Sequence, residues 1–152
     1  VQSFNQLNLP LIVVGKGSER NKLQRIVNAN TTFVSDLTDA ELAQLYINAK
    51  ALIMPQGEEF GYVSLEAQFF GCPVVSYAKG GGSETITENK TGIFFDQQTE
   101  KSLTNAVARF KAIEYNLTRS AQEYGKKNVE KFSRETFEKV FNQFIAENYH
   151  NI

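Results

Sequence analysis

Short apolar runs alternate with amphipathic stretches along most of this chain of 152 residues. The run Leu11-Ile12-Val13-Val14, which ends at Gly15, is typical of a strand that is buried on both faces of a parallel sheet. Similar runs recur four more times along the chain. Together they predict strands over residues 11–14, 32–34, 51–54, 73–77 and 92–95.

Helical spacing of apolar residues fills the segments between these runs and the whole chain after them. Residues 1–8 are expected to be the tail of a helix, and a short helix is expected to begin at Ser83. The other predicted helices cover residues 18–27, 39–46, 62–70, 100–113, 117–129 and 134–148. Their predicted N-terminal caps are Ser18, Asp39, Gly61 and Ser133.

The alternation of strands and helices predicts one α/β domain over residues 1–152. We expect a Rossmann-like parallel sheet with helices on both faces, and a ligand site beyond the carboxyl ends of its strands. Because the chain opens on a helix tail that leads into a strand, a further strand and most of a helix are expected to precede Val1.

Composition excludes several classes of protein. The formal net charge is −1 and the 16 Lys and Arg residues are scattered, which does not favour nucleic-acid binding. The single cysteine, Cys72, excludes a disulfide framework and is expected to be a small buried residue rather than a nucleophile. The single histidine, His150, lies too near the chain end to serve a catalytic triad. No apolar run approaches the ~20 residues that span a bilayer, so we expect the reducing cytosol.

The loop between the third strand and the next helix is the strongest candidate for a ligand site. Its helix is expected to begin near Tyr62 with Gly61 as cap, which leaves the amides of Gly61 through Ser64 free. Free amides at the positive end of a helix dipole favour a phosphate or a pyrophosphate. Glu58 on the loop and Glu66 in the helix are placed to accept hydrogen bonds from sugar or ribose hydroxyls beside that phosphate.

Each of these features also has a purely structural interpretation. The two Glu residues could form a solvated acidic loop and a favourable charge at a helix start. Gly15 and Gly17 suit an ordinary strand-to-helix turn, and their spacing matches neither a P-loop nor a complete Gly-x-Gly-x-x-Gly fingerprint. The segment Gly80-Gly81-Gly82 could aim amides at an anion or could form a flexible turn.

Taken together and in order, these segments resemble the retaining glycosyltransferases of family GT4, which have the GT-B fold. Glu58 and Glu66 have seven residues between them, as in the Glu-x7-Glu motif of that family. The resemblance also covers Val14-Gly15-Lys16-Gly17, residues 33–42, Leu65-Glu66-Ala67, residues 71–75 and Gly80-Gly81-Gly82-Ser83-Glu84. It therefore extends from about Leu11 to Phe95, with the helical remainder compatible.

The resemblance implies that the chain is the C-terminal, donor-binding half of a GT-B glycosyltransferase. The implied donor is a nucleotide sugar, GDP-mannose or a UDP-sugar, and the implied acceptor is a saccharide or a lipid-linked molecule held by a separate N-terminal domain. Transfer of a hexose would retain the anomeric configuration and would need neither a metal ion nor a cofactor. The whole protein is expected in the cytoplasm, with peripheral association at the inner membrane face.

The same resemblance implies a role for each site residue. Glu58 takes the catalytic position and binds hydroxyls of the transferred sugar, whereas Glu66 binds the ribose hydroxyls. The implied donor-binding residues are Gly15, Val34, Ser35, Leu37, Phe60, Gly61, Tyr62, Val63 and Glu66. The family's Arg and Lys for the pyrophosphate would lie before Val1, so residues 1–152 alone are expected to be inactive. A GT-B epimerase or phosphorylase, and a non-catalytic domain that kept the fold, are the alternatives.

Overall fold

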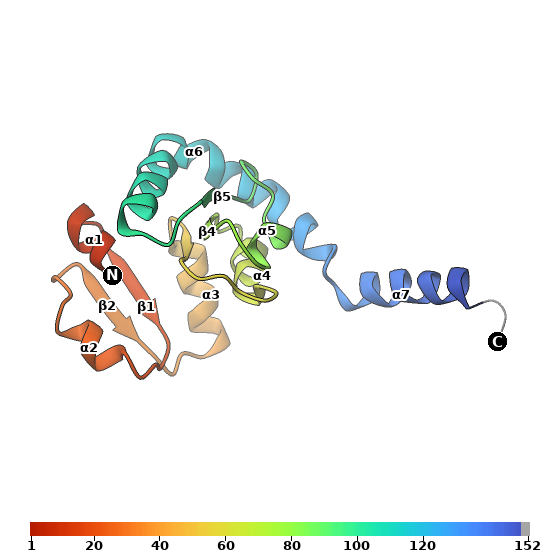
Figure 1. Ribbon diagram of the computed structural model, residues 1–152, viewed down its shortest axis with the longest axis horizontal. Coiled ribbons are helices and arrows are strands. Elements are labelled where there is room, and N and C mark those ends of the chain that lie inside the picture. The colour runs from red at the N-terminus through yellow and green to blue at the C-terminus, as the bar shows by residue number, and fades with distance from the viewer. Residues whose placement is uncertain (150–152) are drawn as a thin grey trace.

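Strand and helix alternate along the chain until two long helices complete it (Figure 1). The computed structural model describes residues 1–149, so His150 lies outside the described part. The strands are β1 (Leu11–Val14), β2 (Thr31–Val34), β3 (Leu52–Met54), β4 (Val74–Tyr77) and β5 (Gly92–Phe95). The helices are α1 (Gln2–Leu7), α2 (Arg20–Gln24), α3 (Asp39–Asn48), α4 (Tyr62–Phe69), α5 (Gly82–Thr85), α6 (Glu100–Glu130) and α7 (Arg134–Asn148). All five predicted strands are present.

Every strand pair is parallel, as the sequence predicts. Hydrogen bonding, however, divides the expected single sheet into a two-stranded sheet, β1-β2, and a three-stranded sheet, β3-β4-β5. The register places Leu11 opposite Thr31 in the first sheet and Leu52 opposite Val74 in the second. Within the described residues, no strand ladder joins β1 to β3.

Helices cover both faces of the three-stranded sheet, which confirms the predicted fold class. Val75 of β4 packs in a core with residues of α1 and α6, and the adjacent Val74 packs in a second core with residues of α3 and α4. Neighbouring strand residues face opposite sides of a sheet. Because helices cover both sides here, both valines are fully buried. Burial of a side chain of this size stabilises the fold by ~1.5–3 kcal/mol.

The two-stranded sheet shares one of these cores. Leu11 of β1 and Ile53 of β3 both pack against the core that contains Phe4 and Phe110. On the other face of β1, Ile12 is 51% exposed and Val14 is 48% exposed. The prediction that this strand is buried on both faces is therefore wrong. Among the described residues, no helix fully covers the face of β1 that carries Ile12 and Val14.

The two helices predicted over residues 100–113 and 117–129 are one continuous helix, α6, of 31 residues. The expected interruption at residues 114–116 contains neither Gly nor Pro, so nothing there ends the helical hydrogen bonding. The buried stripe also continues through the supposed break, from Phe110 to Leu117 and on to Ala121. α6 therefore reaches from the β5 region to the end of α4.

Two helix starts also differ from the prediction. α3 is capped by Thr38 rather than Asp39, since Thr38 and Glu41 form a reciprocal capping box.

α2 begins at Arg20 instead of Ser18 and ends at Gln24. It has no side-chain cap and no buried residue, so little stabilises a longer helix there. The predicted caps Gly61 and Ser133 are confirmed.

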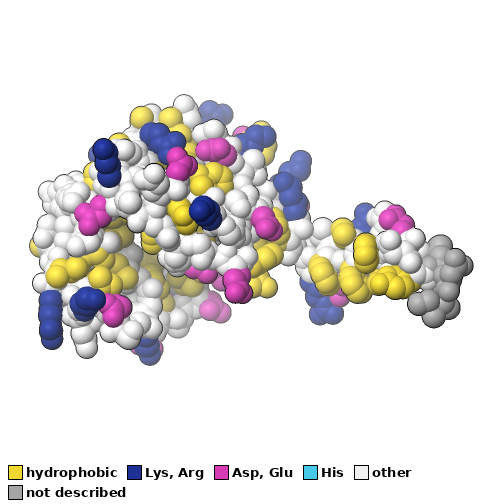
Figure 2. All heavy atoms as spheres, viewed as in Figure 1, with side chains coloured by type: hydrophobic (Ala, Val, Ile, Leu, Met, Phe, Trp, Pro, Cys, Tyr) yellow, Lys and Arg dark blue, Asp and Glu magenta, His cyan; other side chains and the backbone are white. Residues whose placement is uncertain are grey.

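α7 extends away from the rest of the molecule (Figure 1). Its apolar side chains lie on the surface, as Figure 2 shows for this arm, and the exposed fraction of Phe137 is 66%. The apolar stripe contains Phe137, Val140, Phe141, Phe144 and Ile145. Within residues 1–149 no helix combines the length and apolar character that crossing a bilayer requires.

The contact between α6 and α4 depends on Gly125. A Cβ atom at this position would lie 2.2 Å from the carbonyl oxygen of Gln68. We expect Gly125→Ala to lower the free energy of unfolding, since overpacking costs ~1–3 kcal/mol while helix propensity returns at most ~1 kcal/mol. Thermal unfolding followed by circular dichroism would measure this. Gly17→Ala is the matched control, because a Cβ there meets nothing within 4 Å; equal melting temperatures for the two variants would contradict the packing account.

Candidate functional site

The start of α4 presents free backbone amides beyond the carboxyl end of β3. Gly61 caps the helix with a φ of 86°, a conformation that glycine adopts without strain. Among the described residues, the amides of Gly61, Tyr62 and Val63 donate to no backbone carbonyl outside the helix. The amide of Ser64 was also expected to be free, but it donates to the carbonyl oxygen of Gly61 at 3.0 Å. Three donors, not four, are therefore without a backbone partner among the described residues.

A second loop lies directly against this one. The amide of Gly81 donates to the carbonyl oxygen of Glu58 at 2.6 Å, and Glu58 and Gly80 form an isolated parallel bridge. A Cβ at Gly80 would lie 2.3 Å from the Glu58 carbonyl oxygen, and one at Gly81 would lie 2.1 Å from that of Phe60. Close backbone packing therefore accounts for both glycines, which the sequence left open between an anion loop and a flexible turn.

The two proposed carboxylates precede and follow the free amides in the chain, and they have different surroundings. Glu58 is half-buried, and Gln56 Nε2 donates to its Oε1 atom at 2.6 Å. Glu66 is exposed, and its Oε2 atom accepts a hydrogen bond of 3.1 Å from the phenol of Tyr46. Both carboxylates thus keep unpaired oxygen capacity for a ligand, while one neighbour orients each.

Tyr46 is a site residue that the sequence did not predict. It lies on α3, is 8% exposed, and stacks on Phe70 with ring centroids 6.1 Å apart. Burial and the nearby Glu66 carboxylate raise the pKa of the Tyr46 phenol, so it stays a hydrogen-bond donor at neutral pH. Because Tyr46 belongs to the apolar stripe of α3, the sequence pattern indicates a core residue and no role at the site. Only the structure brings it to Glu66.

Phe60 and Tyr62 form an aromatic pair at the helix start. Their ring centroids are 4.7 Å apart, and the rings of Phe60 and Phe132 form a T-shaped pair with centroids 5.9 Å apart. Phe60 is 37% exposed and Tyr62 is 71% exposed, so the pair has apolar surface available beside the amides. Val63, the third of these predicted side chains, is also exposed.

The other predicted residues lie at the carboxyl ends of β1 and β2. Gly15 follows β1 with a φ of 129°, and Arg20 donates to its carbonyl oxygen at 3.2 Å. Val34, Ser35 and Leu37 follow in the next strand and loop and are half-buried. Arg20, whose guanidinium also lies over the Phe33 ring at 5.7 Å, is a cation at this edge that sequence reasoning did not single out.

The structure thus brings the predicted residues together in two groups. Within the described residues, no hydrogen bond joins the group at β1 and β2 to the group at α4. α3 is the link, because it begins after Leu37 and carries Tyr46 to Glu66. No three His, Cys, Asp or Glu side chains of residues 1–149 are grouped so as to hold a metal ion.

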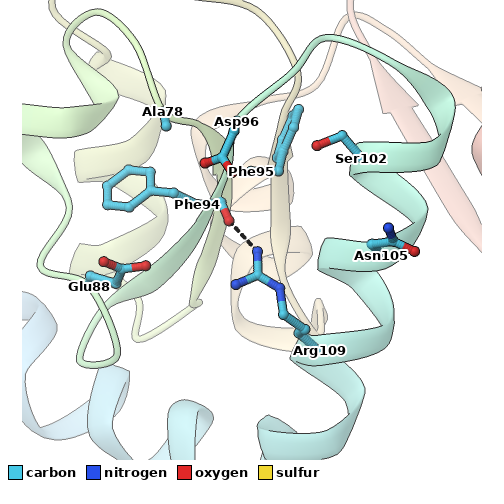
Figure 3. Close-up of a pocket in the computed structure, with 8 residues that line it drawn as sticks. All are labelled: Ala78, Glu88, Phe94, Phe95, Asp96, Ser102, Asn105 and Arg109. Carbon is cyan, nitrogen blue, oxygen red and sulfur yellow. Dashed lines mark hydrogen bonds between the residues drawn. The ribbon is translucent and has the colours of Figure 1, made fainter.

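A hollow of about 510 Å³ lies elsewhere, between β5 and α6. Figure 3 shows Arg109 reaching from α6 to the carbonyl oxygen of Phe94, to which it donates at 2.5 Å. Glu88 and Asp96 lie on the opposite side of the hollow (Figure 3). None of the predicted site residues lines it. β5 is the edge strand of its sheet among the described residues, and Arg109 binds one of the carbonyl oxygens of that strand. We therefore assign the hollow a structural role.

Comparison with known proteins identifies the kind of molecule that shares these features. The family model described as "Glycosyl transferases group 1" matches residues 2–128. The chain is 26% identical over 164 residues to the capsular polysaccharide biosynthesis glycosyltransferase CapM of Staphylococcus aureus. That alignment covers 97% of this chain and 42% of CapM. The chain is 31% identical over 111 residues to a GDP-mannose-dependent alpha-(1-6)-phosphatidylinositol monomannoside mannosyltransferase of Mycobacterium tuberculosis, covering 64% of this chain and 29% of that protein.

A solved structure shows the same fold. Anabaena Alr3699/HepE, crystallised with UDP-glucose, superposes with a TM-score of 0.75 at 18% identity, covering 96% of this chain and 43% of that one. The chain spans less than half the length of each of these three relatives.

Cys72 has the buried environment that the sequence predicts. It is 2% exposed, and burial raises the pKa of its thiol from 9.0 to about 11. We therefore expect little reaction with a thiol reagent near pH ~8 in the folded protein and rapid reaction in denaturant. The raised pKa also links the stability of the fold to pH. The neutral thiol contributes its full share to the free energy of unfolding below pH 9.0, the ordinary pKa of the group, and this share is lost as the pH rises through about 11. Equal labelling rates in native and denaturing buffer would contradict this account.

Proposed function

The chain belongs to the glycosyl transferases group 1 family, and we propose that it holds a nucleoside diphosphate sugar for retaining transfer of a hexose to an acceptor. One observation carries the proposal: the chain that links Glu58 to Glu66 contains the amides of Gly61, Tyr62 and Val63, which have no backbone partner outside α4, and each carboxylate keeps an unpaired oxygen. Amides at a helix start suit a phosphate, and carboxylates suit hydroxyl groups. A sugar nucleotide contains both kinds of group, with hydroxyls on either side of its phosphates.

The proposed roles follow from the order of groups in such a donor. The three amides bind the distal phosphate, and Glu66 accepts hydrogen bonds from the ribose hydroxyls. Glu58, on the loop before the helix, accepts hydrogen bonds from the transferred sugar and takes the catalytic position. Val34, Ser35 and Leu37 border the base, with Gly15 at the neighbouring strand end.

The charge that develops on the leaving diphosphate needs stabilisation by oriented donors. In this proposal the α4 amides and the helix dipole supply part of it, and no metal ion or cofactor takes part. The family's Arg and Lys for the pyrophosphate, which residues 1–152 do not match, supply further positive charge in this proposal. Residues 1–152 alone are therefore proposed to bind the donor without completing the transfer.

The donor and the acceptor are proposed from relatives. A GDP-mannose-dependent relative favours GDP-mannose, and the bound UDP-glucose of a structural neighbour favours a UDP-sugar. The acceptor is a saccharide or a lipid-linked molecule held by another domain, since related proteins act in capsular polysaccharide synthesis and on a phosphatidylinositol mannoside. A lipid-linked acceptor fits a cytoplasmic protein at the inner membrane face.

Titration of the chain with UDP, GDP and ADP, followed by NMR, tests the site directly. We expect one of the nucleotides to shift the amide signals of Gly61, Tyr62 and Val63. Glu66→Gln should weaken that binding about tenfold, because a charge-assisted hydrogen bond contributes ~1.5–3 kcal/mol. Glu59→Gln is the matched control, since Glu59 is an exposed carboxylate with no hydrogen-bond partner in the described part of the chain. Unchanged amide signals with every nucleotide at millimolar concentration would remove the proposal.

The hydrogen bond from Tyr46 to Glu66 generates a separate prediction. Tyr46→Phe keeps the buried ring and its stacking on Phe70 but removes the donor that orients the carboxylate. We expect several-fold weaker binding of the ribonucleotide, on the order of one hydrogen bond, and no change for the 2′,3′-dideoxy analogue. Isothermal titration of both ligands measures the difference, with Tyr115→Phe, at an exposed position, as control. Equal losses for both ligands would show that Tyr46 does not act through the ribose.

A further inference from the structure

Two buried amide side chains connect α4, α5 and α6 behind the candidate site. Gln68 of α4 is fully buried, and Asn128 of α6 is 6% exposed. Asn128 Nδ2 donates to Gln68 Oε1 at 2.9 Å, so the two side chains form a direct pair. Buried polar groups of this kind are expensive unless they are hydrogen-bonded, and both amides here have several partners.

The pair binds one backbone carbonyl oxygen of α4 and one of α5. Gln68 Nε2 donates to the carbonyl oxygens of Ser64 and Thr85, each at 3.0 Å. Asn128 Nδ2 also donates to the Thr85 carbonyl oxygen, at 2.8 Å. Ser64 belongs to the first turn of α4 and Thr85 is the last residue of α5. The amide pair therefore joins the start of the site helix to the helix that follows the glycine loop.

A second layer of hydrogen bonds continues from this pair to the site itself. The hydroxyls of Ser64 and Thr85 lie 2.6 Å apart. Ser64 Oγ lies 2.8 Å from the carbonyl oxygen of Gly61, and Thr85 Oγ1 lies 2.9 Å from that of Gly81. Because each hydroxyl has one hydrogen, one of the two donates to the other and the second donates to its carbonyl oxygen. Gly61 is the cap of α4 and Gly81 contacts the backbone of Phe60. Contacts between buried residues thus connect Asn128 to the carbonyl oxygen of Gly61, the cap residue of α4.

We propose that Gln68 and Asn128 are positioning residues that fix the α4 amides relative to the glycine loop and thereby shape the pocket for the distal phosphate. The proposal rests on the proposed donor-binding function. An apolar pair of the same size would fill the same volume, but it would leave the carbonyl oxygens of Ser64 and Thr85 without these donors. Hydrogen bonds fix distance and direction, which apolar packing does not.

Asn128 is the better position for a test, because its own Oδ1 atom accepts from Thr87 at 3.2 Å and Lys131 at 3.0 Å. Asn128→Asp keeps these acceptor contacts and the side-chain shape, but it removes the donor to Gln68 and Thr85. Asn105→Asp introduces the same charge at an exposed position of the same helix and is the matched control.

The experiment compares UDP with UMP, and GDP with GMP, by calorimetric titration of the chain and its variants. Only the diphosphates carry the distal phosphate. We expect Asn128→Asp to bind the diphosphate about tenfold more weakly and the monophosphate as the unmodified chain does, whereas Asn105→Asp changes neither. Equal weakening of both nucleotides, or no change in either, would overturn the positioning role.

A second measurement needs no nucleotide. In ligand-free NMR spectra, the amide signals of Gly61, Tyr62 and Val63 should shift in Asn128→Asp and stay in place in Asn105→Asp. Unshifted signals would also overturn the proposal. If the unmodified chain binds neither diphosphate, the donor-binding function fails, while these shifts still decide whether the amide pair positions the helix start. Thr87→Val, which removes a single bond to Asn128, replaces Asn128→Asp if that variant does not fold, with smaller shifts expected.

Discussion

The closest backbone contact in the site is the constraint on which the remaining geometry depends. Residues 58–60 lie against Gly80 and Gly81 with no room for a Cβ atom between the two segments. This contact brings the loop that follows β3 and the loop that follows β4 to one edge of the sheet. The loop that carries Glu58 and leads to the free amides of α4 is therefore packed tightly against the glycine loop.

Helix packing maintains that contact from behind. α6 crosses α4 where Gly125 allows its backbone to approach the Gln68 carbonyl oxygen, and Asn128 lies about one turn further along the same helix. The apolar cores on the two faces of β4 stabilise the sheet, while the buried polar groups between α4, α5 and α6 set the orientation of the helix start. Apolar burial and directional hydrogen bonding therefore have separate tasks in this fold.

Local pattern predicted the strands well because each apolar run is short and is followed within three residues by Gly, Pro, Ser or Asp. The cap at Gly61 and the buried state of Cys72 also followed from the sequence. Among the features that did not follow are the continuity of α6, the bond between Tyr46 and Glu66, and the amide pair of Gln68 and Asn128. The last two join residues 20 and 60 positions apart, and a polar residue in an apolar stripe carries no signal of its distant partner.

The division of the strands into two sheets bears on how the two ends of the site are held together. In the proposed site the phosphate end belongs to β3-β4-β5 and the base end to β1-β2, and no strand ladder within the described residues joins the two sheets. Their relative position depends on the shared core and on α3, whose Tyr46 reaches Glu66. Side-chain contacts resist displacement less than a ladder of parallel backbone hydrogen bonds does. A ligand that contacts both ends would supply a further connection, and part of its binding free energy would be used to order β1-β2 against α4.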